Sequence, residues 1–157
     1  MNKKIKLLIY SFVLFIIQIY FLDLLRIISI KADLFIPFLV NLGLSYNLGY
    51  VLGFGFFWGF LKDLLEIYPW GINSLIFFLS TYLIYKLSHT LVIESTHFKV
   101  LVVVLFCILI NIFEAVFLWF YGILPSPGIF IKTTFLFTFY TAILSIPIFK
   151  TMDPLCR

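Results

Sequence analysis

Long apolar segments with short polar connections dominate this 157-residue chain. A helix needs about 20 mostly apolar residues to cross the roughly 30 Å hydrocarbon core of a bilayer. Five segments meet this requirement: 5–25, 48–66, 71–88, 98–122 and 129–149. The chain is 64% apolar and 11% charged, whereas soluble domains average about 45–50% and about 25%. A soluble core of this size could not bury so much apolar surface. The sequence therefore predicts an all-α integral membrane protein with one transmembrane domain over residues 1–157.

A sixth segment, 34–47, is shorter and more polar, and it could cross the membrane or be a re-entrant piece. The distribution of Lys and Arg separates these alternatives, because cytoplasmic loops carry an excess of both. Six crossings with the N-terminus inside place seven of the 11 Lys and Arg residues on the inner side. Five crossings place only five there. We therefore expect six transmembrane helices with both termini in the cytoplasm.

The first segment follows Lys3, Lys4 and Lys6, as a secretory signal would. It continues through bulky residues to Asp23 without a small-x-small cleavage site, so we expect an uncleaved anchor. The basic residues flank apolar segments, which argues against a nucleic-acid-binding patch. The partner that composition indicates is the lipid bilayer.

Residues for catalysis or metal binding do not gather in a recognisable pattern. His89 and His97 lie in a polar connector without further ligands, whereas zinc takes about four. Cys107 lies in an apolar run and Cys156 in the tail, so we expect no disulfide between them. The sequence has no nucleophile–base pair, P-loop or H-E-x-x-H motif. We expect no enzymatic activity, no cofactor and no metal site.

Small residues and one acid share a face of the segment 48–66. Gly55, Gly59 and Asp63 follow one another at intervals of four residues, within about 80° of the helix circumference. Gly49 and Gly53 form a second pair with the same spacing. In lipid, such glycines let two helix backbones approach closely. The face could serve packing within the bundle or contact with another protein. Asp63 needs a partner or water at this depth.

Polar residues also line the last two segments. Asn111 and Glu114 lie on one side of segment 98–122, where an ionised carboxylate costs several kcal/mol unless it is paired or hydrated. Glu114 could contact a ligand or partner, or it could bond within the bundle. Segment 129–149 carries a stripe of four hydroxyls within about 60°: Thr134, Thr138, Thr141 and Ser145. Such a stripe can wall a polar cavity, but it more often packs helices together.

Gly55, Gly59 and Asp63 are followed by Trp70-Gly71-Ile-Asn-Ser-Leu75. This motif within 31–80 resembles the rod shape-determining protein MreD family. The family pattern is roughly G-F-x-x-G-x-x-x-D followed, after a short connector, by L-G-x-x-x-L, and Lys31-Ala-Asp33 precedes it here. The matching positions are Gly55, Gly59, Asp63, Gly71 and Leu75. Three positions depart from the pattern: Trp70 replaces Leu, Ala32 stands where Pro is common, and Lys62 is atypical. Lys62 is on another face from Asp63 and could simply extend to the membrane surface.

The resemblance implies a six-helix bundle similar to the S-components of energy-coupling-factor transporters, without catalysis. It implies a bacterial cytoplasmic (inner) membrane protein that binds an MreC-like single-span partner. Through that partner it would belong with MreB, RodA and a class B penicillin-binding protein, which together direct side-wall peptidoglycan synthesis. The face of Gly55, Gly59, Asp63 and Gly71 is then the candidate surface for the partner's membrane helix.

A second hypothesis is a transporter component that binds a small molecule inside its bundle. Asn111, Glu114 and the hydroxyl stripe Thr134, Thr138, Thr141 and Ser145 would then line the pocket. The two hypotheses share a predicted fold, so the fold does not separate them. The 53–75 pattern and the absence of a long polar loop that could cover a substrate favour the scaffold.

Overall fold

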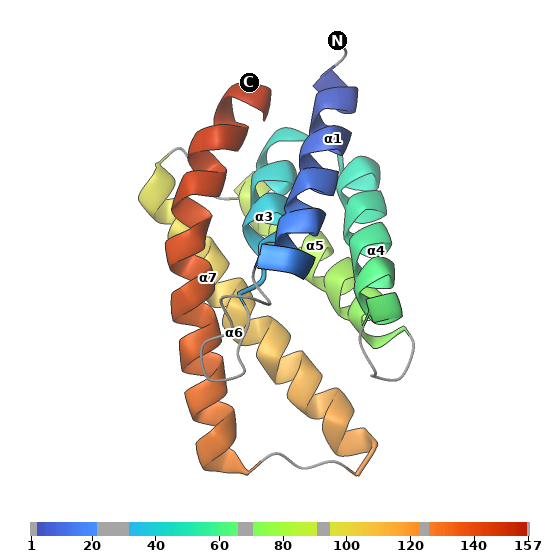
Figure 1. The fold of residues 1–157 in the computed structure, drawn as a ribbon, viewed down its shortest axis with the longest axis vertical. Helices are drawn as coiled ribbons and strands as arrows, with labels where there is room; N and C mark the ends of the chain where they lie inside the picture. Colours follow the sequence, from blue (N-terminus) through green and yellow to red (C-terminus); the bar gives the residue numbers. More distant parts are fainter. Residues whose placement is uncertain (1–2, 22–31, 66–70, 91–94, 123–125, 157) are drawn as a thin grey trace.

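Six helical segments form a bundle in the part of the chain that this computed structural model describes, residues 3–21, 32–65, 71–90, 95–122 and 126–156 (Figure 1). Helix α1 (Lys3–Ile16) continues into a π-helical turn, η1 (Ile17–Phe21). The remaining helices are α3 (Phe35–Ser45), α4 (Leu48–Leu65), α5 (Ile72–Thr90), α6 (Thr96–Phe120) and α7 (Pro127–Cys156). Both chain termini lie at the same end of the molecule.

The described helices are apolar, as expected for an all-α membrane protein, but they differ in length. Three of them are long and apolar enough to cross a bilayer: Leu48–Leu65, Thr96–Phe120 and Pro127–Met152. Three shorter apolar helices accompany them: Ile5–Tyr20, Phe35–Ser45 and Ile72–Leu87. The predicted segments therefore all contain a helix. Helix α7 is longer than its predicted segment, since it starts before residue 129 and continues past residue 149 to Cys156. Residues 22–25 and 66 of the predicted segments lie outside the described residues.

Helix α3 is the centre of the bundle. Every residue from 32 to 43 is buried, and α3 packs against α4, α5, α6 and α7. Its 11 residues rise about 16 Å, roughly half the hydrocarbon core. The weak segment 34–47 thus contains a half-length helix that is mostly enclosed by protein: Asn41 is buried, whereas Ser45 and Asn47 at its end are exposed.

Trp58 of α4 joins α1, α3 and α4 through its ring. Its indole stacks on Phe35 of α3 with ring centroids 4.8 Å apart, and it touches Phe12 and Phe15 of α1 at 5.8 and 5.2 Å. The side chain is 1% exposed. Aromatic pairs of this kind contribute about 0.5–1.5 kcal/mol beyond the area they bury. Trp58 is therefore a core residue of the three-helix contact.

The face of Gly55 and Gly59 packs against α5 of the same chain. A Cβ atom at Gly59 would lie 2.6 Å from Ser74 Cα and 2.7 Å from the Asn73 carbonyl oxygen. One at Gly55 would overlap Thr81. Packing within the bundle is thus the correct interpretation of these glycines. The expectation that Gly55 and Gly59 receive a partner's helix is wrong, because α5 already covers them.

We predict that Gly59→Ala destabilises the protein whereas Gly53→Ala does not. The added methyl meets backbone atoms at Gly59, and such overpacking typically costs about 1–3 kcal/mol. At Gly53 nothing lies within 4 Å of the new Cβ, so the better helix propensity of Ala contributes up to about 1 kcal/mol. Thermal unfolding in detergent, followed by circular dichroism, measures both. Equal melting temperatures for the two variants would contradict the packing.

Candidate functional site

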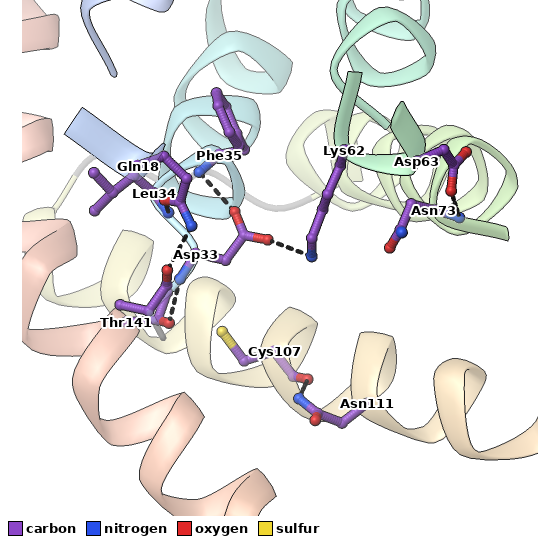
Figure 2. Close-up of polar contacts among 11 residues, drawn as sticks. Gln18, Asp33, Leu34, Phe35, Lys62, Asp63, Asn73, Cys107, Asn111 and Thr141 are labelled. Atoms are coloured by element: carbon purple, nitrogen blue, oxygen red, sulfur yellow. Dashed lines mark hydrogen bonds and ion pairs between the residues drawn. The ribbon is translucent and has the colours of Figure 1, made fainter. Parts of the chain in front are cut away.

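An ion pair inside the bundle connects the start of α3 to the end of α4 (Figure 2). Lys62 Nζ lies 3.1 Å from Asp33 Oδ2, and Asp33 is only 2% exposed. The second carboxylate oxygen, Oδ1, accepts a hydrogen bond from the Phe35 backbone N–H at 2.9 Å. The Asp33 N–H donates to Thr141 Oγ1 of α7 at 3.1 Å. One acidic residue therefore joins three helices.

Gln18 completes the polar contacts at the start of α3. Its Nε2 donates to the Ala32 carbonyl at 2.8 Å, and its Oε1 accepts from the Leu34 N–H at 3.0 Å. Non-helical backbone at membrane depth must be satisfied by the protein itself, and Gln18 supplies both a donor and an acceptor. It belongs to the π-helical turn η1, and such turns occur often at functional sites. Gln18 was not among the predicted site residues, although a lone amide in an apolar run is a sequence signal for a buried polar contact.

Lys62 points inward, which corrects the expectation that it extends to the membrane surface. Besides Asp33, its ammonium group lies 5.3 Å from the centre of the Phe77 ring of α5. The side chain is 19% exposed. The helix register carries Lys62 and its neighbour Asp63 to different partners, because successive residues are about 100° apart.

Asp63 caps the start of α5. Its Oδ1 accepts from the Asn73 N–H and its Oδ2 from the Ser74 N–H, both at 2.9 Å. The Ser74 hydroxyl also donates to Oδ2. The first N–H groups of a helix have no partner within the helix, and a carboxylate there also interacts favourably with the helix dipole. Asp63 thus finds the partner that an acid at this depth needs.

Asp63 and Gly71 also line an open apolar groove between α4 and α5, of about 470 Å³. Gly71 precedes α5 with φ +98°, a conformation that favours glycine. The rest of the lining is mostly large apolar side chains: Phe56, Phe60, Leu64, Leu75 and Phe78, together with Ser74. Of the four residues expected to contact a partner, this groove brings together two.

The polar residues of α6 serve separate purposes. Asn111 Nδ2 donates to the Cys107 carbonyl of its own helix at 2.8 Å. Glu114 is partly buried and lines a small cavity with Asn73 of α5. That cavity holds about 20 Å³, the volume that one water molecule needs. Asn111 and Glu114 are both half-buried, but their described contacts differ, and the small cavity is lined by Glu114 without Asn111.

The four hydroxyls of the α7 stripe also differ in their contacts. Thr141 binds the Asp33 backbone, and Ser145 donates to the Ala142 carbonyl at 2.6 Å. The buried hydroxyls of Thr134 and Thr138 have no hydrogen-bond partner among the described residues. Of these four hydroxyls, Thr141 is the one with a described hydrogen bond to another segment. It accepts from the Asp33 backbone N–H, just before α3.

No group of three or more His, Cys, Asp or Glu side chains that could hold a metal ion occurs within the described ranges. Comparisons with protein-family models, curated proteins and solved structures find no match. They therefore give no support to the resemblance to MreD proteins or to transporter S-components, and that resemblance depends on the motif residues alone.

We predict that Lys62→Met destabilises the protein by about 3–5 kcal/mol, because it leaves the buried Asp33 carboxylate without its cation. The double variant Asp33→Asn/Lys62→Met should recover part of this loss. Denaturation by sodium dodecyl sulfate, followed by helical circular dichroism, gives the free energies for a double-mutant cycle. The control is Lys132→Met, which removes an exposed Lys of α7. A Lys62→Met protein as stable as the control would contradict the pair.

We also predict that Asp63→Ala loosens the start of α5, since losing a cap costs about 0.5–2 kcal/mol. Hydrogen–deuterium exchange should become faster in the peptide beginning at Ile72, and remain unchanged in the peptide beginning at Pro127. Asp63→Asn keeps one acceptor oxygen and should have a smaller effect. Unchanged exchange in both variants would show that the cap does not hold α5.

Proposed function

We propose that this chain is a non-catalytic membrane scaffold of the MreD type, which acts in bacterial cell elongation. It would bind an MreC-like single-span protein and contribute to rod shape and side-wall peptidoglycan synthesis with MreB, RodA and a class B penicillin-binding protein. We place it in the cytoplasmic membrane with six crossings, both termini in the cytoplasm, and a bundle similar to transporter S-components.

The observation that carries this proposal is the set of contacts made by three charged side chains inside the bundle. Asp33, Lys62 and Asp63 are each engaged in joining helices of the same chain. Polar groups in a ligand-binding site are aimed at the ligand, whereas these side chains are aimed at backbone N–H groups and at one another. Such an interior supports a structural role.

The motif residues support the same proposal. Gly59 allows close approach, Asp63 caps the next helix and Gly71 makes the turn before it. The pattern shared with MreD proteins thus describes one α4–α5 joint. Asp33, from the Lys31-Ala-Asp33 motif, lies before α3 and pairs with Lys62 of α4.

The groove between α4 and α5 is our candidate for the partner site. Phe56, Phe60 and Leu64 follow one another along α4 at intervals of four residues and are 53%, 45% and 50% exposed. Leu75 and Phe78 form the opposite wall and are 46% and 41% exposed. A single apolar helix can pack between two such ridges, where dispersion supplies the attraction that water does not.

The alternative is a small-molecule-binding transporter component, for which Glu114 is the strongest candidate. The cavity that Glu114 lines holds about 20 Å³, whereas ligand pockets span about 300–1,000 Å³. This difference favours the scaffold.

We predict that Leu75→Trp, which fills the groove, lowers recovery of the partner about tenfold, equivalent to roughly 1.4 kcal/mol of binding. The tagged protein is coexpressed with the MreC-like protein of its own host and extracted in mild detergent. The partner is quantified by native mass spectrometry.

The matched control is Phe139→Trp, at an exposed position of α7, which should recover the partner normally. Equal recovery with both variants would place the interface elsewhere. A bound small molecule or an ATPase pair, without a single-span partner, would replace the scaffold with the transport component.

A further inference from the structure

A second groove lies on the other side of α4, between α4 and α1. It has a volume of about 340 Å³, within the range of ligand pockets. Its floor is the backbone of Gly49 and Gly53, where nothing lies within 4 Å of an added Cβ. Its walls are mostly large apolar side chains: Leu8 and Phe12 of α1 with Ser11, and Tyr50, Phe54 and Phe57 of α4.

The groove offers a ligand almost only apolar contacts. Ser11 is 1% exposed, and its hydroxyl already donates to the Leu8 carbonyl at 2.8 Å. Gly49 and Gly53 are themselves exposed. A hydrocarbon chain could therefore lie against the bare backbone of α4 without leaving the Ser11 hydroxyl unsatisfied.

One end of this groove is closed. Trp58 contacts Phe12 at a ring-centroid distance of 5.8 Å and Phe57 at 5.3 Å. These rings fill the space between α1 and α4 one to two turns beyond Gly53. From Gly49 to Phe57 the groove therefore runs for about 12 Å, less than half the hydrocarbon thickness. A transmembrane helix, about 10–12 Å wide, would need a longer and wider surface.

The first turns of α1, beyond the other end of the groove, are basic in sequence. Helices α1 and α4 run in the same direction, and the first turns of α1 extend past the start of α4 at the end where both termini lie (Figure 1). Lys3, Lys4 and Lys6 occupy these turns, before Leu8. The sequence has no acidic residue before Asp23. Basic residues beside a membrane helix attract anionic lipid headgroups.

We propose that this groove binds one acyl chain of an anionic phospholipid from the leaflet on the side of the chain termini. The acyl chain lies over Gly49 and Gly53 and ends against Phe12 and Trp58, while the phosphate lies beside the first turns of α1. The lipid fills the gap between α1 and α4 where their side chains do not meet. This binding is independent of the scaffold function.

The test uses Trp58 as a reporter, in full-length protein carrying Trp70→Phe and Trp119→Phe. The protein is placed in phosphatidylcholine vesicles with a minor share of phosphatidylglycerol brominated in its acyl chains, and Trp58 quenching is measured. The reverse experiment brominates a matching share of phosphatidylcholine. We expect an association preference for the anionic lipid of about fivefold.

Two variants separate the groove from general attraction to the surface. Gly53→Leu fills the groove where space is open, so it should fold normally and abolish the excess quenching. Gly128→Leu, at another glycine with open surroundings, should not change it. Replacing Lys3, Lys4 and Lys6 with Gln should remove the preference for phosphatidylglycerol.

Three outcomes would overturn the proposal. Equal quenching by the two lipids would mean ordinary bilayer contact. A preference that persists in Gly53→Leu but requires the lysines would mean headgroup attraction without a groove. Quenching that disappears when a copurified membrane helix is retained would assign the groove to that helix.

Discussion

The ion pair of Asp33 and Lys62 allows a helix to begin inside the bundle instead of at a membrane surface. The start of α3 exposes backbone N–H groups at a depth where water cannot satisfy them. Asp33 accepts one of them, Gln18 another, and Thr141 accepts the N–H of Asp33 itself. The carboxylate that does this must be neutralised, since an unpaired buried charge costs several kcal/mol. Lys62 supplies the compensating charge, and the half-length α3 can then be enclosed by the other helices.

Helix α4 acts as the organiser of this arrangement, because two adjacent residues at its end join two different helices. Lys62 reaches the start of α3, and Asp63 caps the start of α5. Farther back on α4, Gly55 and Gly59 bring α5 close enough for that cap to form, and Trp58 faces α3 and α1. The polar contacts of Lys62 and Asp63 and the aromatic contacts of Trp58 therefore hold α4 against its neighbouring helices from different sides.

The sequence is informative about what is local and silent about partners far away in the chain. Apolar length predicts the helices, and a four-residue spacing predicts the close approach at Gly55 and Gly59. The same spacing cannot tell whether the approaching helix belongs to this chain, because small residues serve both cases. A lysine near a helix end can extend to the membrane surface or turn inward, and only the fold, which brings Asp33 beside it, decides for Lys62. Gln18 is a lone amide in an apolar run, but no local pattern indicates its partners, which are backbone atoms 14 and 16 residues away.

A motif that builds a joint between helices does not by itself assign a function. The same joint could support a scaffold or a transport component, since one fold serves many functions. Function must then come from surfaces that the joint leaves open. Here these are the two apolar grooves on either side of α4, one against α5 and one against α1. Their apolar walls are largely exposed, whereas Lys62 and Asp33 face each other inside the bundle and Asp63 and Lys99 bond to neighbouring helices.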